Sequence, residues 1–343
     1  MKNTIMLLIA VLVFFPIFGQ DLKSKQDSAS VISYYDRIML KANIDTRTDS
    51  YLSKSLNSND DELNIRNNNA LKMFFNLNYR FLSVSFGFAP EFLPGNNDDQ
   101  LKGESSFSDI KFRLFFGNWI QELHYSKVSG FYVVNTGDFF SGWQKDIDPY
   151  FQFPGISITS WGGTTGYVMN PKYSLKSLYF KTEWQKKSSG SFIPSISYYY
   201  DHYSLRFKEY LGSDSIEKIF TLSSAISYYY TMVIHNKWYV APYATAKSGV
   251  KFSNFKYNRS DNDTAESHTY FTIALEGGIQ IGYNTPRLFF GSAFNINSNW
   301  YTSSENNRLI NDKIYGAVYV GYRFNAPKFI ANTFDKAEDK LKL

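Results

Sequence analysis

The stretch TYFTIALEGGIQIGY, from Thr269 to Tyr283, decides the fold of this chain. Its odd-numbered positions are mostly large and apolar, whereas the even-numbered positions carry small or polar residues such as Glu276 and Gln280. Alternation with a period of two indicates a β-strand whose two faces meet different surroundings. It continues over fifteen residues, whereas most strands of globular proteins have about 5–6 residues. The stretch therefore predicts an unusually long strand with one apolar face.

The same alternation recurs along the chain, most clearly at Leu71–Tyr79, Ile110–Phe116, Leu288–Trp300 and Ile314–Phe324. One face is always apolar and aromatic, and the other carries small, polar and charged residues. Such lengths suit tilted membrane-spanning strands that extend beyond the bilayer. We therefore predict an all-β chain folded as an antiparallel up-and-down transmembrane β-barrel. A soluble β-sandwich or jelly roll is the alternative, because its strands would also alternate.

Short turns and long polar stretches alternate between the strand candidates, as in outer-membrane barrels. Thirteen candidates begin near Ile38, Leu71, Leu82, Ser108, Trp119, Ile156, Leu175, Ser191, Ile219, Trp238, Thr269, Arg287 and Lys313. A closed bacterial barrel with both chain ends in the periplasm needs an even number of strands. We interpret the segment near Ile156 as a loop and predict about 12 strands, within a range of 10–14. Fourteen strands remain open.

The N-terminus has the features of a secretory signal peptide. Lys2 precedes an apolar run from Ile5 to Phe18, and Gly19 leads into polar sequence. The run is shorter than the roughly 20 residues of a membrane-spanning helix. We predict a signal peptide over residues 1–19, a periplasmic N-terminal segment over 20–36, an outer-membrane barrel over 37–325 and a periplasmic C-terminal tail over 326–343.

Composition excludes several classes of protein. The chain has no Cys, a formal net charge of +5 and a mean hydropathy of −0.33. It therefore has no disulfide, thiolate metal site or lipid-anchored Cys, and it is too polar for a helical membrane bundle. Its scattered basic residues do not suggest nucleic-acid binding. We expect no cofactor and no metal, and the expected partners are outer-membrane lipid and lipopolysaccharide, the barrel-assembly machinery and small solutes.

The pentapeptide ISYYY occurs twice, at Ile196–Tyr200 and at Ile226–Tyr230. A Tyr at a membrane interface places its ring among the lipid headgroups and its hydroxyl in water. We interpret the repeat as marking the same boundary of the bilayer on neighbouring strands. The predicted membrane girdle comprises Tyr198, Tyr200, Tyr228, Tyr230, Tyr283, Trp300, Tyr322 and Phe324.

Charged residues on the opposite faces are predicted to line the lumen. The set comprises Arg37, Lys41, Lys72, Arg80, Lys111, Arg113, Lys181, Lys247, Lys251, Glu276, Lys313 and Arg323. Fewer acids share this parity, namely Asp45, Glu183, Asp201 and Glu276. Surplus positive charge inside a low-dielectric wall concentrates anions and favours their passage. The first hypothesis is therefore a small anion-preferring diffusion channel.

A closed structural or adhesion barrel, which would bind partners or glycans through its extracellular loops, is the alternative function. Barrels of about eight strands are filled by side chains, whereas 16–18 strands leave an aqueous channel. Twelve strands lie between these sizes, so strand number does not decide between the two functions.

The sequence His202-Tyr203-Ser204 has the His-x-Ser spacing seen in outer-membrane phospholipases and lipid A deacylases. Period two places His202 and Ser204 together on the lipid-facing side. A third group must orient the His, and Glu217 on the following strand falls on the lumen side. No HExxH, Walker or GxSxG pattern occurs. We do not expect an enzyme, and an outer-membrane lipid acyl hydrolase using His202 and Ser204 is the second alternative.

The stretch WQKKSSGSFIPSISYYY (Trp184–Tyr200) resembles a segment, Q-K-K-S-x-G-S-F, that marks an uncharacterised family of Bacteroidota cell-envelope proteins. Arg37–Arg47 and Gly321–Lys328 resemble the first and last strands of that family, so the resemblance covers nearly the whole mature chain. It implies an outer-membrane barrel with no established activity. In many barrels the chain stops at a terminal aromatic used for insertion. Phe324 fits that role, but Asn325–Leu343 continues beyond it.

Overall fold

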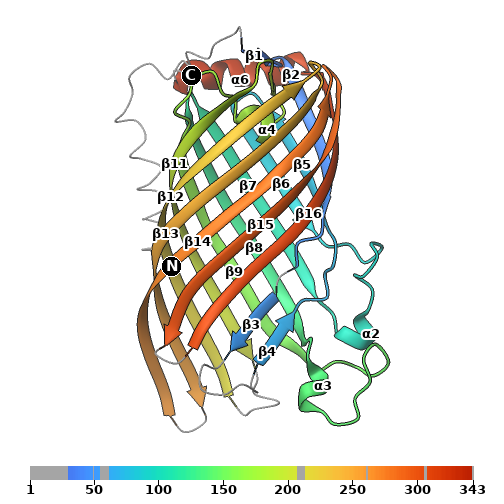
Figure 1. Cartoon of the computed structure of the whole chain (residues 1–343), viewed down its shortest axis with the longest axis vertical. Coiled ribbons are helices and arrows are strands. Elements are labelled where there is room, and N and C mark those ends of the chain that lie inside the picture. Colours follow the sequence, from blue (N-terminus) through green and yellow to red (C-terminus); the bar gives the residue numbers. More distant parts are fainter. Residues whose placement is uncertain are drawn as a thin grey trace.

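A computed structural model describes residues 30–48, 50–54, 62–206, 213–259, 262–304 and 307–341. The predicted signal peptide and most of the predicted N-terminal segment lie outside these residues. The described chain forms a closed antiparallel barrel of twelve strands (Figure 1), which confirms the predicted fold class. None of the described helices is long and apolar enough to span a membrane.

Twelve strands make the wall. They are β2 (Arg37–Asp45), β5 (Lys72–Tyr79), β6 (Leu82–Phe88), β7 (Ser106–Phe116), β8 (Trp119–Val133), β9 (Gln152–Tyr167), β11 (Ser189–Arg206), β12 (Ser213–Ile234), β13 (Trp238–Arg259), β14 (Asn262–Asn284), β15 (Leu288–Ser304) and β16 (Asn307–Asn325). Each strand pairs with the next in this order, and β16 returns to β2. Closure pairs the wall strands on both sides and so removes free sheet edges.

The two ends of the barrel differ. At the turn end, uppermost in Figure 1, short turns join β5 to β6, β7 to β8, β12 to β13 and β14 to β15. The segment between β9 and β11 also lies at the turn end. The opposite end, the loop end, carries the remaining connections, including the hairpin of β3 (Ser50–Lys54) and β4 (Glu62–Arg66) and the short helices α2 (Asp99–Lys102) and α3 (Thr136–Phe139). β8 continues past the first residue of β7 at the loop end, and there its residues Tyr132 and Val133 pair with β4.

The interpretation of the segment near Ile156 as a loop was wrong. Ile156 lies in β9, which pairs with β8 on one side and β11 on the other. The candidate near Leu175 is the one that does not join the wall, because it forms α4 (Lys176–Tyr179) and β10 (Glu183–Gln185). Its apolar residues mimic a membrane strand because they pack against the inner wall, where Leu175 and Phe180 are buried.

The interpretation of ISYYY was wrong about the boundary. The copies lie on antiparallel neighbours, so Tyr200 pairs with Phe220 of β12, whereas Tyr230 pairs with Gly190 of β11. Ten residues of β11 separate these two levels, which is about 33 Å along a strand and about 25 Å along the axis of a tilted barrel. The terminal tyrosines of the two copies, Tyr200 and Tyr230, therefore lie at opposite borders of an apolar band about 25 Å tall.

Aromatic residues cluster near both borders. At the turn end, Trp238, Tyr283 and Phe290 contact one another, with ring centroids of Tyr283 at 5.0 Å from Trp238 and 5.3 Å from Phe290. Nearer the loop end, Tyr200 stacks on Trp161 at 6.1 Å. Of the predicted girdle residues, those towards the turn end are Tyr228, Tyr230, Tyr283, Tyr322 and Phe324, and those in the loop-end half are Tyr198, Tyr200 and Trp300.

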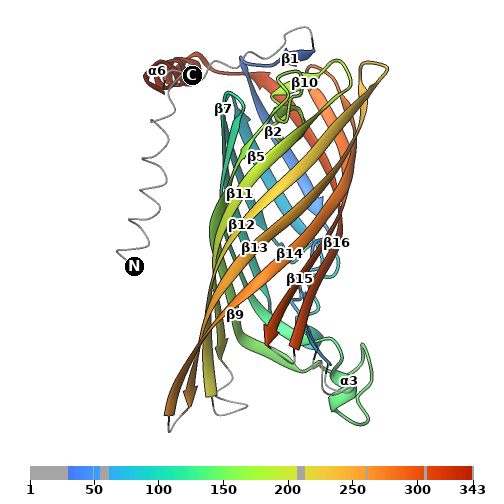
Figure 2. The ribbon, with the colours of Figure 1, turned by 60° about the vertical axis from the view of Figure 1, so that its left-hand side comes forward.

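Two elements lie at the turn end outside the wall. The strand β1 (Val31–Ser33) pairs with β10 in a separate two-stranded sheet. The helix α6 (Lys328–Leu341) follows β16 and extends sideways from the barrel (Figure 2).

Candidate functional site

The segment between β9 and β11, residues 168–188, folds into the turn end of the barrel, and we call it the plug. Its apolar side chains form one hydrophobic cluster with the inner wall, comprising Val168, Tyr173, Leu175, Leu178, Phe180 and Trp184 of the plug and Phe115, Ile193, Tyr239 and Ala241 of the wall. Phe180 is fully buried, and its ring meets that of Phe115 edge-on at 4.8 Å. Burial of one such side chain stabilises the fold by about 1.5–3 kcal/mol.

The plug backbone is also hydrogen-bonded to the wall. Asn78 Nδ2 donates to the carbonyl of Phe180 at 2.8 Å, and Arg323 Nε donates to the carbonyl of Lys181 at 2.6 Å. A second nitrogen of Arg323 donates to the carbonyl of Thr285 at 2.7 Å. Only 1% of Arg323 is exposed, and removing a partner of a buried polar group costs about 1–3 kcal/mol. Arg323 therefore ties the plug to the β14–β15 turn.

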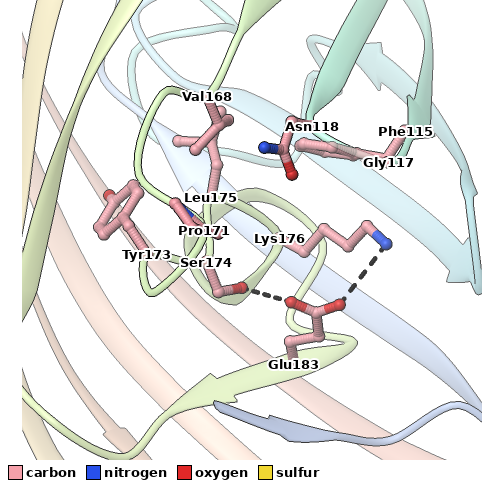
Figure 3. A pocket seen from close by; sticks show the side chains of 10 residues that line it. All are labelled: Phe115, Gly117, Asn118, Val168, Pro171, Tyr173, Ser174, Leu175, Lys176 and Glu183. Carbon is pink, nitrogen blue, oxygen red and sulfur yellow. Dashed lines mark hydrogen bonds and ion pairs between the residues drawn. The ribbon is translucent and has the colours of Figure 1, made fainter. Parts of the chain in front are cut away.

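Polar groups within the plug pair with one another (Figure 3). Glu183 accepts a hydrogen bond from Ser174 Oγ at 2.6 Å and lies 3.5 Å from Lys176 Nζ. Gln185 Oε1 accepts from the backbone N–H of Ser174 at 2.8 Å, and its Nε2 donates to the carbonyl of Lys172 at 2.8 Å. The plug is therefore held in shape by its own buried hydrogen bonds.

The cavity beside the plug is small. It lies between the plug and the β7–β8 turn at Gly117 and Asn118 and has a volume of about 20 Å³. That volume holds about one water molecule. A solute larger than water therefore does not fit into this cavity.

Lys181 was predicted on a strand of the wall, and the structure instead places it in the plug. Its Nζ donates to the hydroxyl of Tyr239, which lies 2.5 Å from the hydroxyl of Tyr319. Burial, followed by the nearby charges of Lys41 and Arg323, lowers the pKa of Lys181 well below its ordinary value. The charged form of this Lys is therefore costly in the folded barrel.

Several charges on the inner wall are paired. Arg113 binds Glu122 across the β7–β8 hairpin, and Lys247 Nζ lies 2.8 Å from Glu276 Oε1. A second group joins Asp109 to His124 Nε2 at 2.8 Å and to Lys111 Nζ at 3.4 Å. Within the described residues, no group of three or more His, Cys, Asp or Glu side chains forms a metal site.

Sequence reasoning missed Asp109, Glu122 and His124. These residues could have been found from the register of the hairpin around Gly117-Asn118. That register places Glu122 opposite Arg113 and His124 opposite Lys111. Asp109 shares the face of Lys111 through period two. The predicted surplus of positive charge in the lumen is therefore smaller than a count of basic residues suggests.

The remaining predicted lumen residues fall at different places. Those on the inner face of the wall are Lys41, Lys72, Lys111, Arg113, Lys247, Lys251, Glu276 and Arg323. Arg37 lies at the rim of the turn end, where it donates to the carbonyl of Pro286 at 2.5 Å. The side chain of Lys313 lies outside the described residues.

The prediction that Arg80 lines the lumen was wrong. Arg80 lies in the β5–β6 turn with a φ of 50°, and its guanidinium binds α6 through Asp335 at 2.7 Å and Glu338 at 3.0 Å. The same group lies 4.1 Å from the ring centroid of Tyr35. Period-two parity fails here because a residue in the left-handed region does not continue the strand.

His202 and Ser204 share the outer face of β11, where His202 is opposite Lys218 of β12. Glu217 instead accepts a hydrogen bond from Ser253 Oγ at 2.6 Å, on the inner side. Among the described residues, no side chain hydrogen-bonds to the His202 ring. The described residues therefore supply no orienting group of the kind that a His-dependent hydrolase needs.

At the loop end, the connection between β8 and β9 exposes a set of apolar side chains that we call the loop surface. Phe139, Phe140 and Ile147 are 49%, 47% and 68% exposed. Trp143 supports this surface, because its ring packs 4.8 Å from Tyr150 and its Nε1 donates to a backbone carbonyl. Exposed apolar patches of this kind often mark interaction sites.

Solved structures that match this chain are outer-membrane barrels of low sequence identity. They include OmpT of Vibrio cholerae (8% identity, 84% of this chain and 97% of that chain, TM-score 0.33) and the outer-membrane protease OmpT of Escherichia coli (7%, 87% and 100%, TM-score 0.36). The beta domain of the Bordetella autotransporter BrkA also matches (10%, 85% and 100%, TM-score 0.37).

None of the curated proteins matches this sequence. Residues 25–324 match the family described as domain of unknown function DUF4421, and the chain therefore belongs to that family.

Proposed function

We propose that this protein is a closed barrel of the outer membrane that binds partners or glycans outside the cell through its loop end. Outer-membrane barrels have short periplasmic turns and longer extracellular loops, so the turn end faces the periplasm. Export by the N-terminal signal peptide, in a cell of the Bacteroidota, is part of this proposal.

The plug is the observation that carries the proposal. The side chains of its hydrophobic cluster fill the periplasmic mouth of the lumen, and hydrogen bonds from Asn78 and Arg323 hold the plug there. A diffusing solute would have to displace buried aromatic rings and break charge-assisted hydrogen bonds, each worth about 1.5–3 kcal/mol. The loop surface, with its exposed Phe139, Phe140 and Ile147, then offers the binding area.

An anion-preferring channel is the second candidate, and the accessibility of the inner wall favours it. The side chains of Lys247 and Glu276 are 26% and 24% exposed, so water reaches the wall between the plug and the loop end. Displacement of the plug would join this water to the periplasm. The pairing of Arg113 with Glu122 weakens the basis for anion preference.

Planar-bilayer recordings test the closed barrel. In one variant, an eight-residue Gly-Ser linker replaces residues 169–188. It must span about five unpaired residues of β11, or about 17 Å. In a matched control, the same linker replaces residues 138–147 of the loop surface.

The wild type and the loop variant are expected to show no steady conductance, and the plug variant is expected to conduct. Steady conductance of the wild type would contradict the closed barrel. Reversal potentials of the conducting variant in a salt gradient, with and without Lys111→Glu, would then measure any anion preference.

The same two variants test binding. Purified surface polysaccharide from the same cells is expected to bind the wild type and the plug variant, and to bind the loop variant at least tenfold more weakly. Equal binding by all three proteins would reject the loop surface as the binding area.

A further inference from the structure

The helix α6 has one apolar side and one charged side. Phe329, Ile330, Phe334 and Leu341 gather on one side at the spacing of a helix, and the charged residues gather on the other. Phe329 and Leu341 are 72% and 48% exposed. The apolar side is therefore not satisfied by the protein alone.

A polar latch fixes α6 against the wall. Glu338 accepts hydrogen bonds from Tyr35 Oη and from Arg80, and Asp335 lies 2.7 Å from Arg80. On the apolar side of the helix, the ring of Phe334 meets that of Tyr79 edge-on at 4.7 Å. These contacts hold the apolar side of α6 towards the outer surface of β5 and β6.

A groove of about 380 Å³ separates α6 from that outer surface. It is lined by Ile38, Leu77, Tyr79, Leu82 and Val84 of the wall and by Phe329, Ile330, Thr333 and Phe334 of α6. The wall residues are continuous with exposed, lipid-facing side chains such as Leu40 and Phe75. The groove therefore opens into the apolar band of the barrel and not into the lumen.

One polar atom marks the groove. Tyr79 is only 4% exposed, and its hydroxyl, which lies beside Arg80, has no acceptor for its own proton among the described residues. The guanidinium of Arg80 lies 5.0 Å from the ring centroid of Tyr79. A hydroxyl with an unused donor, beside a cation and next to an apolar groove, matches the join between the acyl chain and the headgroup of a lipid.

We propose that α6 lies in the surface of the periplasmic leaflet and that the groove holds an acyl chain of one phospholipid from that leaflet. The Tyr79 hydroxyl donates to an ester or phosphate oxygen of this lipid. Lys336 and Lys340, which follow one border of the apolar side, reach the headgroup layer, as long basic side chains do at membrane interfaces. This inference is independent of what the loop surface binds.

Native mass spectrometry of the folded barrel tests the lipid site. The protein is purified in detergent and incubated with phosphatidylethanolamine and phosphatidylglycerol. The wild type is expected to retain one phospholipid. Val84→Trp, which fills the groove, is expected to retain at least fivefold less, whereas Leu40→Trp, a matched change on the lipid-facing surface outside the groove, is expected to behave like the wild type.

Tyr79→Phe tests the contribution of the hydroxyl separately from that of the apolar groove. It keeps the ring, so the barrel is expected to fold and to retain several-fold less phospholipid than the wild type. Equal retention by the wild type and Val84→Trp would overturn the site. So would a wild-type barrel that retains only detergent or only lipopolysaccharide.

Spin labelling tests the position of α6, because the chain has no native Cys. Labels at Ala337→Cys on the apolar side and at Asn332→Cys on the polar side are compared in vesicles of the same two lipids. The first label is expected to collide mainly with oxygen, which concentrates in lipid, and the second mainly with a water-soluble nickel chelate. Equal access of the chelate to both labels would place α6 in water and reject the proposal.

Discussion

Two buried basic residues hold the turn end of this barrel together in different ways. Arg323 is always charged and satisfies its donors with carbonyl groups of the plug and of a turn. Lys181 lies near Arg323 and donates to the hydroxyl of Tyr239. A Lys in such a place can lose its proton, which an Arg does not. The seating of the plug should therefore depend on pH through Lys181.

The free energy of unfolding is expected to rise between pH 7 and pH 9.5. The pKa of Lys181 is lowered in the fold, whereas in the unfolded chain it is about 10.4. Between these two pKa values the unfolded chain binds more protons than the folded barrel. The free energy of unfolding therefore increases as the pH rises through this range. Samples are heated to a series of temperatures at each pH before electrophoresis. The temperature at which the band of the folded barrel disappears measures this change.

Lys181→Met should weaken this pH dependence. It is also expected to raise the stability at pH 7 by about 1 kcal/mol, because an apolar side chain of similar length avoids the cost of burying a basic amine. Lys187→Met, at an exposed position of the same segment, should behave like the wild type. A wild-type midpoint that does not change with pH would contradict the assignment.

His202→Ala and Ser204→Ala are expected to leave the lipid A and phospholipid profiles of the host unchanged. The described residues include no group that orients the His, which a hydrolase of this kind requires. Mass spectrometry of total lipid extracts from cells expressing each variant checks this. Loss of acyl chains that requires both residues would instead support the acyl hydrolase.

Among the elements, the plug is the part that distinguishes this barrel from an empty cylinder. It is joined to the N-terminal part of the chain by the β1–β10 sheet, where Ile32 is opposite Trp184. The sheet ends in backbone hydrogen bonds from Lys186 to Ser30 and from Tyr34 to Thr182, both at 2.8 Å. The residues preceding the barrel therefore help to seat the plug.

Ile32→Pro is expected to loosen the plug. Proline has no N–H to donate across the sheet, and one backbone hydrogen bond contributes about 1 kcal/mol. Amide hydrogen exchange of residues 182–186 should speed up about fivefold, while exchange in β13 stays unchanged. Ile32→Thr, which keeps the N–H and the branched side chain, is the control, and equal exchange in both variants would show that β1 does not support the plug.

At the scale of the whole molecule, the wall is uneven. β12, β13 and β14 have 22, 22 and 23 residues, whereas β5 and β6 have 8 and 7. The long strands exceed the 9–11 residues that cross a bilayer, so they extend the wall beyond the membrane at the loop end (Figure 2). The opposite side carries the β3–β4 hairpin and the loop surface instead.

The closed wall is expected to resist detergent. An unheated sample should migrate differently from a boiled one on an electrophoresis gel, because paired strand edges keep the barrel folded in detergent. The protein is also expected to sediment with outer membranes. Recovery as a soluble periplasmic monomer without a mobility shift would contradict a membrane barrel.

The sequence by itself determined the wall. Period-two alternation is a local consequence of strand geometry, so stretches such as Thr269–Tyr283 show one lipid-facing side without any knowledge of their neighbours. The strand class, the long apolar faces and the approximate strand number follow from that. Even the parity of Lys111 and Arg113 follows, because both lie within one regular strand.

Only the tertiary structure decided what fills the lumen inside the wall. The apolar residues of the plug read as another membrane strand, since burial against an inner wall and exposure to lipid select the same side chains. The turn at Arg80 interrupts the alternation of the strand, so the guanidinium of Arg80 pairs with carboxylates of α6 and does not line the lumen. The partners of Lys181 and Arg323 come from distant strands, and no local pattern encodes contacts that exist only once the barrel has closed.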